Sequence, residues 1–183
     1  MMGIDWKEVE KLVKPSPSYK ELVKRILEVL PYDFVRKHYD HNMKEAEEYA
    51  TRLLGSDPKQ RYGEYMEKLN RVFKQLDSLN VQSYSELVHL VDTREKLEEF
   101  HNRTKLAPKE LIRVLRYLHS WVLPTKMYLR ELIDKKNQTH NEYTTALRKN
   151  NIRFTLDILE KGGTKEAREK ITKETGVPEH FLH

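Results

Sequence analysis

Residues 76–112 and 147–183 align without a gap at an offset of 71 residues, and this internal repeat constrains the fold more than any other feature. Seven of the 37 aligned positions are identical, against about two or three expected by chance at this composition. Five further pairs keep apolar character: Val81/Ile152, Leu87/Ile158, Val88/Leu159, Phe100/Ile171 and Leu106/Val177. Because the same positions would face a core twice, the pattern predicts two tandem helical units that pack as neighbours.

The composition and the apolar spacing predict α-helices throughout the chain. Charged residues make up 34% of the 183 residues, with six Gly and seven Pro, and the apolar residues recur at the helical period rather than alternating as in strands. Longer helices precede the repeat: one lies between Pro17 and Pro31, one runs from Tyr32 to Gly55, and one follows Pro58.

We therefore predict an all-α, multi-helix array in two parts. The first is an N-terminal helical region over residues 1–75, and the second is a pair of tandem short-helix repeats over 76–146 and 147–183. The segment between Lys126 and Asn150 fits either one bent helix or a hairpin around Asn137 to Thr139, and the sequence leaves both open.

Cap residues predict where the short helices begin. Ser83 with Glu86 three residues later has the capping-box spacing, and Thr93 and Thr164 stand at the start of matched helices. Pro178 is a good first residue for another helix, but the second copy stops just after Leu182. We expect the chain to be a fragment of a longer protein; the alternative is a natural end whose last turn is frayed or packs on another chain.

The second copy resembles an uncharacterised helix-hairpin-helix-like domain, a domain of unknown function found in archaeal and bacterial proteins. The resemblance rests on the pairs Asn151-Ile152, Ile158-Leu159, Thr164 with Arg168, Thr175-Gly176 and Phe181-Leu182. It covers residues 147–183, and more loosely 76–112, where Leu97 replaces the Arg and Lys105 the Gly.

The resemblance implies a helical fold related to modules that bind the DNA backbone without reading its sequence, and it implies no catalytic residues. Those modules grip phosphate with an apolar-Gly-apolar-Gly turn, and this sequence has no such turn. The nearest feature is Gly162-Gly163, which could form a small backbone nest, whereas the first copy has Val91-Asp92 there.

Positive charge is concentrated in the second half of the chain. Residues 1–101 hold 17 basic and 19 acidic residues, while residues 102–183 hold 17 and 10. The helix after Pro108 is apolar on one face and basic on the other. The candidate nucleic-acid-binding residues are Lys109, Arg113, Arg116, Lys126, Arg148, Lys149 and Arg153, and Tyr117, Trp121 or Tyr128 could add stacking. A solvated helix face explains the same pattern.

The sequence contains no motif typical of an enzyme, a metal site or a cofactor site. Cysteine is absent, which excludes disulfides and thiolate ligands, and we find no Gly-rich phosphate loop or nucleophile elbow. His38 with His41 and His180 with His183 have i, i+3 spacing but are interpreted as surface residues. With no signal sequence and no membrane span, we expect a cytoplasmic protein without a membrane partner.

Two functions remain open on the sequence alone. The first is a non-catalytic helical module that contacts the backbone of DNA or RNA through its basic C-terminal half, without sequence specificity. The alternative is a helical scaffold or oligomerisation module that binds another copy of itself or another protein.

Overall fold

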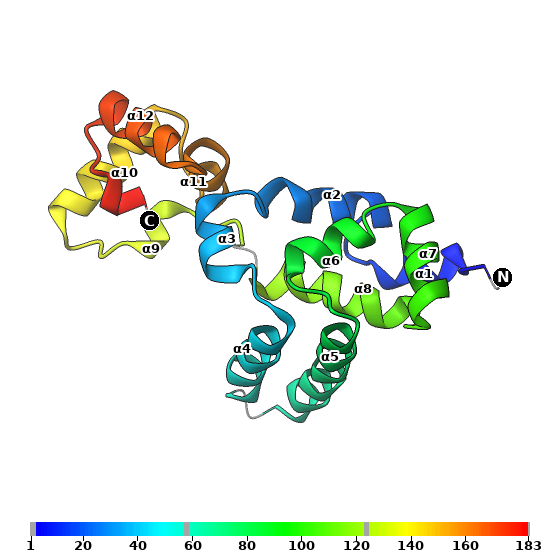
Figure 1. Cartoon of the computed structure of the whole chain (residues 1–183). Coiled ribbons are helices and arrows are strands. Elements are labelled where there is room, and N and C mark those ends of the chain that lie inside the picture. The colour runs from blue at the N-terminus through cyan, green and yellow to red at the C-terminus, as the bar shows by residue number, and fades with distance from the viewer. Residues whose placement is uncertain (1–2, 57–58, 123–124, 183) are drawn as a thin grey trace. The chain divides into compact units, whose positions relative to one another are not determined.

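The computed structural model describes residues 3–56, 59–122 and 125–182, with the side chains of residues 121 and 122 left out. Within these ranges every regular element is a helix (Figure 1). The one β-type contact among the described residues is an isolated bridge between Tyr128 and Phe154. The prediction of an all-α fold is confirmed.

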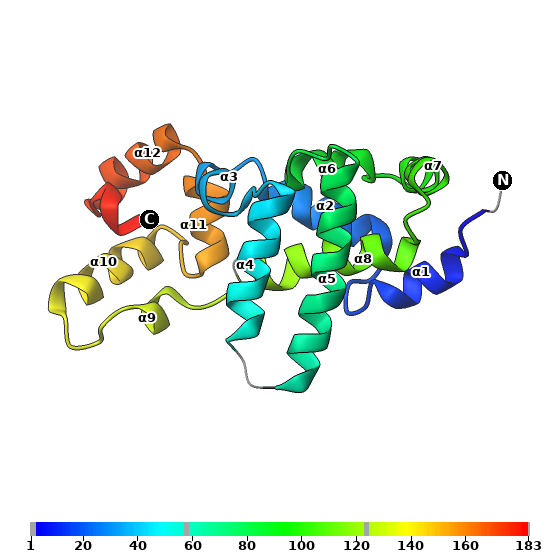
Figure 2. The same cartoon turned by 60° about the horizontal axis from the view of Figure 1, so that its bottom comes forward.

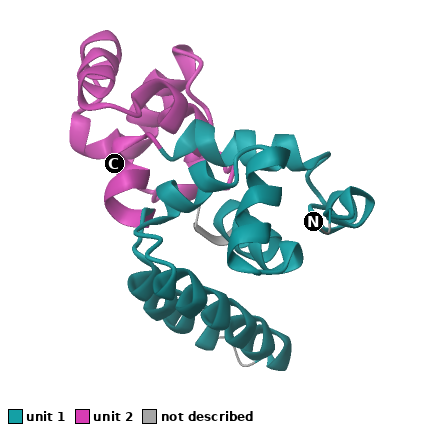
Figure 3. Cartoon of the chain, turned by 45° about the vertical axis from the view of Figure 1, so that its right-hand side comes forward, with its two compact units in different colours: residues 1–30, 40–122 teal, residues 31–39, 123–183 magenta. Residues whose placement is uncertain are grey.

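The chain forms two compact units (Figure 3). Unit 1 comprises residues 1–30 and 40–122, and unit 2 comprises residues 31–39 and 123–183. The chain therefore leaves unit 1 after Leu30, contributes one helix to unit 2, and returns to unit 1 at Asp40. The sequence predicted a boundary at residue 75, between the N-terminal helical region and the first repeat, and this division stays a prediction. Residue 75 lies inside a helix of unit 1.

Unit 1 is built around a long helical hairpin and a buried helix. Its elements are α1 (Trp6–Leu12), α2 (Tyr19–Val29), α4 (Met43–Gly55), α5 (Gln60–Ser78), α6 (Tyr84–Leu90), α7 (Arg94–Thr104), α8 (Pro108–Tyr117) and the π-helical turn η1 (Leu118–Val122). Helices α4 and α5 lie side by side in both views (Figures 1 and 2). Phe73 of α5 packs edge-on against Tyr84 and Tyr117, with ring centroids 6.0 and 6.1 Å away.

Unit 2 is smaller and has shorter helices. Its elements are α3 (Asp33–Tyr39), α9 (Leu129–Leu132), α10 (Gln138–Lys149), α11 (Thr155–Gly162), α12 (Lys165–Thr175) and the 3₁₀ turn η2 (Glu179–Leu182). Its core contains Leu147, Ile152, Ile171, Val177 and Leu182. Helix α10 begins after Asn137, whose side chain accepts from the His140 amide, so the segment left open by the sequence is a hairpin and not one bent helix.

The helix predicted from Tyr32 to Gly55 is wrong, because the chain breaks it after Tyr39. Asn42 starts a new helix with a capping box: its side chain accepts from the Glu45 amide, and the Glu45 carboxylate accepts from the Asn42 amide. This reciprocal pair satisfies two backbone groups that a continuous helix would have bonded internally. The break allows α3 and α4 to belong to different units.

The backbone of the two units has the same local features at positions 71 residues apart. Helices α7 and α12 begin after Thr93 and Thr164, and both end at a left-handed residue, Lys105 (φ 62°) or Gly176 (φ 73°). Further matched features are left-handed Asn80 and Asn151, the hydroxyl bonds of Thr104 and Thr175 to the carbonyls of Phe100 and Ile171, and the amide bonds of Val81 and Ile152 to the carbonyls of Leu76 and Leu147.

The buried positions match in the same way. The five core residues of unit 2 correspond at this offset to Leu76, Val81, Phe100, Leu106 and Leu111, and each of these is at most 4% exposed in unit 1. One difference is a charge: Leu97 is fully buried in unit 1, and its counterpart in unit 2 is Arg168, 7% exposed.

The parallel extends upstream of residue 76, beyond the sequence match. The Tyr84 amide donates to the His41 carbonyl, and the Thr155 amide donates to the Met127 carbonyl. Helices α4 and α9 each begin two residues after these carbonyls. The hairpin that follows is shorter in unit 2, since α9 and α10 have 4 and 12 residues against 13 and 19 in α4 and α5.

Candidate functional site

The seven basic residues selected from the sequence are divided between the two units. Lys109, Arg113 and Arg116 lie on α8 of unit 1, whereas Lys126, Arg148, Lys149 and Arg153 belong to unit 2. Unit 2 is also the more basic unit, with 14 basic and 10 acidic residues against 20 and 19 in unit 1.

The three residues on α8 lie on the polar side of an amphipathic helix, as predicted. Lys109 and Arg116 are exposed and Arg113 is half-buried, while the opposite face contributes Leu111 and Leu115 to the core. Tyr65 of α5 lies near Arg113 and Arg116; burial raises the pKa of its phenol, and the two cations partly oppose this.

The four residues in unit 2 do not form one group. Arg148 and Arg153 line a shallow depression of about 420 Å³ together with Arg130, a residue the sequence analysis did not select. Lys149 lines a separate depression that it shares with the carboxylate residues Glu142 and Glu174. We therefore remove Lys149 from the candidate site and add Arg130.

Lys126 lies near the same depression, because it contacts an aromatic pair at its edge. Tyr128 and Phe154 face each other across the isolated bridge, with ring centroids 4.5 Å apart. The Lys126 ammonium lies 4.2 Å from the Phe154 ring, and the Arg130 guanidinium lies 5.0 Å from the Tyr128 ring, both within cation–π range. We call Lys126, Tyr128, Arg130, Arg148, Arg153 and Phe154 the basic–aromatic cluster.

Backbone hydrogen bonds hold the cluster in place. The Leu129 amide donates to the Arg153 carbonyl over 2.9 Å, and the Thr155 amide donates to the Met127 carbonyl over 3.0 Å. The Thr155 hydroxyl donates to the Thr125 carbonyl over 2.6 Å. These bonds hold residues 125–129 against residues 153–155, about 25 positions later in the chain, so the side chains of the two segments share one surface.

The Asp157 carboxylate accepts from the Arg153 and Phe154 amides, so one acidic group lies at the backbone of the cluster. None of the described residues lining the depression is acidic, and among the described residues Arg130, Arg148 and Arg153 form no ion pair. The three arginines are exposed, and Tyr128 is 43% exposed. Planar guanidinium groups beside a partly exposed aromatic ring suit an anionic ligand that also carries a flat ring.

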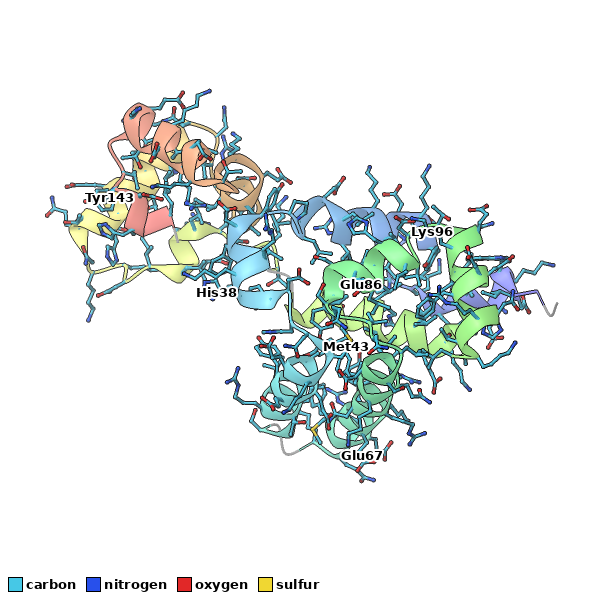
Figure 4. All side chains as sticks on the ribbon, in the orientation of Figure 1. His38, Met43, Glu67, Glu86, Lys96 and Tyr143 are labelled. Carbon is cyan, nitrogen blue, oxygen red and sulfur yellow. The ribbon has the colours of Figure 1, made fainter. Side chains whose placement is uncertain are left out.

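Other predicted features do not contribute to this surface. Tyr117 is fully buried and cannot stack on a ligand, and the Trp121 side chain lies outside the described residues. Gly162 and Gly163 are buried, and the Tyr32 ring covers Gly163, so the expected nest is not open to phosphate. Exposed His38 lies on α3 (Figure 4), and across the described chain no three His, Asp or Glu side chains form a metal site.

Unit 2 also contains an apolar groove of about 500 Å³. Helices α3, α9, α10 and α11 and the turn η2 contribute to its walls, with Arg168 as the one cation among the described lining residues. Phe181 of η2 closes one side, where its ring packs against His140 and against Tyr143, labelled in Figure 4.

No family model, no curated protein and no solved structure matches the chain. Within the described ranges, no helix is both long and apolar enough to cross a bilayer.

The members of the cluster that sequence reasoning missed had a weak local signal. Arg130 and Phe154 stand in the short stretches "TKMYLR" and "IRF", where cations alternate with aromatic residues. The two stretches become one site only through the bridge between Tyr128 and Phe154, which no periodicity indicates.

Proposed function

We propose that the protein binds single-stranded nucleic acid through the basic–aromatic cluster, without reading its sequence. The observation that carries the proposal is the exposed Tyr128 ring beside a depression lined by three arginines, one of which, Arg130, lies over the ring. Arginine can pair with phosphate oxygens in a bidentate manner, and base–aromatic stacking is tolerant of sequence because every base has a π-face.

We further propose that the two units are tandem copies of one helical module of the helix-hairpin-helix-like type. The matched caps, left-handed residues and core positions support common descent. Because the glycine turn of helix-hairpin-helix modules is absent from the sequence, binding in this protein would depend on side chains instead of backbone amides. The proposal includes no catalytic step.

The test is fluorescence anisotropy with a labelled single strand of about 20 nucleotides, titrated with the full chain at several salt concentrations. The affinity should fall as salt rises, with a slope of roughly 0.7 for each phosphate contact on a single strand. The triple variant Arg130→Gln, Arg148→Gln, Arg153→Gln should lower that slope by about 2. Tyr128→Ala should weaken binding by about 1–3 kcal/mol.

A matched variant removes the same charge from α8: Lys109→Gln, Arg113→Gln, Arg116→Gln. It should leave the affinity within a factor of about two. An equal loss in both triple variants would mean that binding follows net charge and that the cluster is not the site. Absence of binding to single strands, duplex DNA and RNA at low salt would refute the function itself.

A further inference from the structure

The arginine-lined depression of the basic–aromatic cluster adjoins the second depression of unit 2, because Asn141 and Thr145 line both. The second depression is electrically balanced, since its charged lining residues are Lys136, Glu142, Lys149 and Glu174. The Glu142 carboxylate accepts from the Gln138 amide group over 3.0 Å and has no cationic partner among the described residues. A nucleic-acid backbone, with one negative charge for each phosphate, therefore gains no net attraction beyond this edge of the arginine-lined depression.

The aromatic pair extends the surface in another direction. Tyr128 lines the depression, whereas Phe154 does not, and the two rings lie 4.5 Å apart. The Lys126 ammonium lies 4.2 Å from the Phe154 ring, so a second ring and a further cation follow beyond Tyr128. A single strand that leaves the depression in this direction meets both an aromatic side chain and a positive charge, the two contacts that such strands use.

The depression itself has the size of a site for one small ligand. Its volume of about 420 Å³ lies within the range of roughly 300–1,000 Å³ that is typical of small-molecule sites. Three arginines line it, and none of its described lining residues is acidic. A phosphate monoester has a charge of about −1.5 to −2 at pH 7 and three strong acceptor oxygens. It therefore suits three arginines better than a phosphate inside a strand, which has a single charge.

We infer that the depression holds the terminal nucleotide of a single strand, with a phosphate monoester among Arg130, Arg148 and Arg153 and the base on Tyr128. The rest of the strand leaves across Phe154 toward Lys126. This inference rests on the proposed single-strand binding and adds to it a preference for a phosphorylated end. A 5′-phosphate and a 3′-phosphate present the same monoester, so the experiment uses both.

The experiment compares internally labelled single strands by anisotropy with the full chain. Three strands of about 20 nucleotides carry a 5′-phosphate, a 3′-phosphate or no terminal phosphate. A fourth strand, without a terminal phosphate and about two nucleotides longer, has about the same total charge as the phosphorylated strands. At least one phosphorylated strand should bind about tenfold more tightly than both unphosphorylated strands, because it makes additional charge-assisted hydrogen bonds.

Two neighbouring residues provide matched variants of the protein. Arg148 lines the arginine-lined depression, whereas Lys149 lines only the second depression, and both side chains are exposed. Arg148→Gln and Lys149→Gln each remove one positive charge without disturbing the core. Arg148→Gln should lose most of the preference for the phosphorylated end, and Lys149→Gln should keep it. Lys126→Gln should weaken all four strands by a similar factor and leave the preference unchanged.

Equal affinity for the phosphorylated and the charge-matched strands would overturn the inference and leave the proposed function standing, because single strands would still bind. An equal loss of preference in Arg148→Gln and Lys149→Gln would show that the preference follows net charge, and would also overturn it. Free adenosine monophosphate that binds as tightly as the phosphorylated strand would replace the strand end as the ligand. If none of the four strands binds, the proposed function and this inference fail together.

Discussion

The Nη1 of Arg168 donates a hydrogen bond to the carbonyl oxygen of Gly162 over 3.1 Å, at the C-terminal end of α11. Helix ends leave such carbonyls without partners inside the helix. In unit 1 the corresponding carbonyl, that of Val91, accepts instead from the hydroxyl of Tyr19 on α2. The two units therefore satisfy the same backbone group with different side chains from different helices.

Replacing Arg168 with Leu, the residue at the matched position in unit 1, should destabilise unit 2. The Gly162 carbonyl would lose its partner, and Arg168 also lies 3.4 Å from Glu179 and 3.8 Å from Asp33. Both carboxylates are partly exposed and can be hydrated, so we expect a loss of about 1–3 kcal/mol. Hydrogen exchange in α11 and α12 measures it, and unchanged exchange would contradict this role of Arg168.

Gly163→Ala should also destabilise unit 2, by about 1–3 kcal/mol. A Cβ atom there would lie 2.5 Å from Cδ1 of Tyr32 and push away the segment that leads into α3, whose Asp33 amide donates to the Gly163 carbonyl. Gly63→Ala is the control, because its Cβ meets nothing within 4 Å, and it should stabilise α5 by up to about 1 kcal/mol. Thermal unfolding distinguishes the two; similar effects would exclude the Tyr32 contact as the cause.

Lys105 and Gly176 occupy matched left-handed positions, so placing Gly at the first and Ala at the second should change stability in opposite directions. Lys105→Gly should stabilise the end of α7, and Gly176→Ala should destabilise the end of α12, each by about 1 kcal/mol, since a Cβ atom disfavours the left-handed conformation. Open space surrounds Gly176, so its cost comes from the backbone alone. Urea unfolding of each variant checks the pair. A loss of stability in Lys105→Gly would be inconsistent with the argument.

Half-buried His119 should make unit 1 less stable in mild acid. Burial lowers the pKa of its imidazole, and Arg25 lowers it further. Below the unfolded pKa of about 6.5 the unfolded chain binds the proton more readily, so stability falls as the pH drops from that value towards the lower pKa of the folded protein, and then levels off. Burial also lowers the pKa of His41. His119→Gln should therefore reduce, without abolishing, the loss of stability between about pH 7.5 and 5.5 in urea unfolding; an undiminished loss would contradict the prediction.

Much of the local structure could be predicted, because caps and amphipathic faces depend on residues within a few positions of one another. Ser83, Thr93 and Thr164 each accept an amide hydrogen bond at the helix start where they were expected. The interruption at Asn42 was missed, although Glu45 gives it the spacing of a capping box. Apolar residues on both sides of it suggested one continuous helix.

The candidate site was predicted only in part, because its members are brought together by long-range contacts. Arg148 and Arg153 were selected for their charge, and Tyr128 for its ring. Arg130 and Phe154 joined them only when the bridge placed the two segments side by side. The basic residues of α8, which the sequence joined to the same surface, belong to unit 1.

The amino-acid sequence by itself determined the helical class, many of the helix starts and the positions that are buried in both halves, since these follow from local hydrogen bonding and from the period of the helix. Only the tertiary structure decided which helices share a core. It assigned α3 to unit 2 and buried Arg168 where its counterpart is Leu97. These outcomes depend on contacts between residues far apart in the chain, which local spacing does not specify.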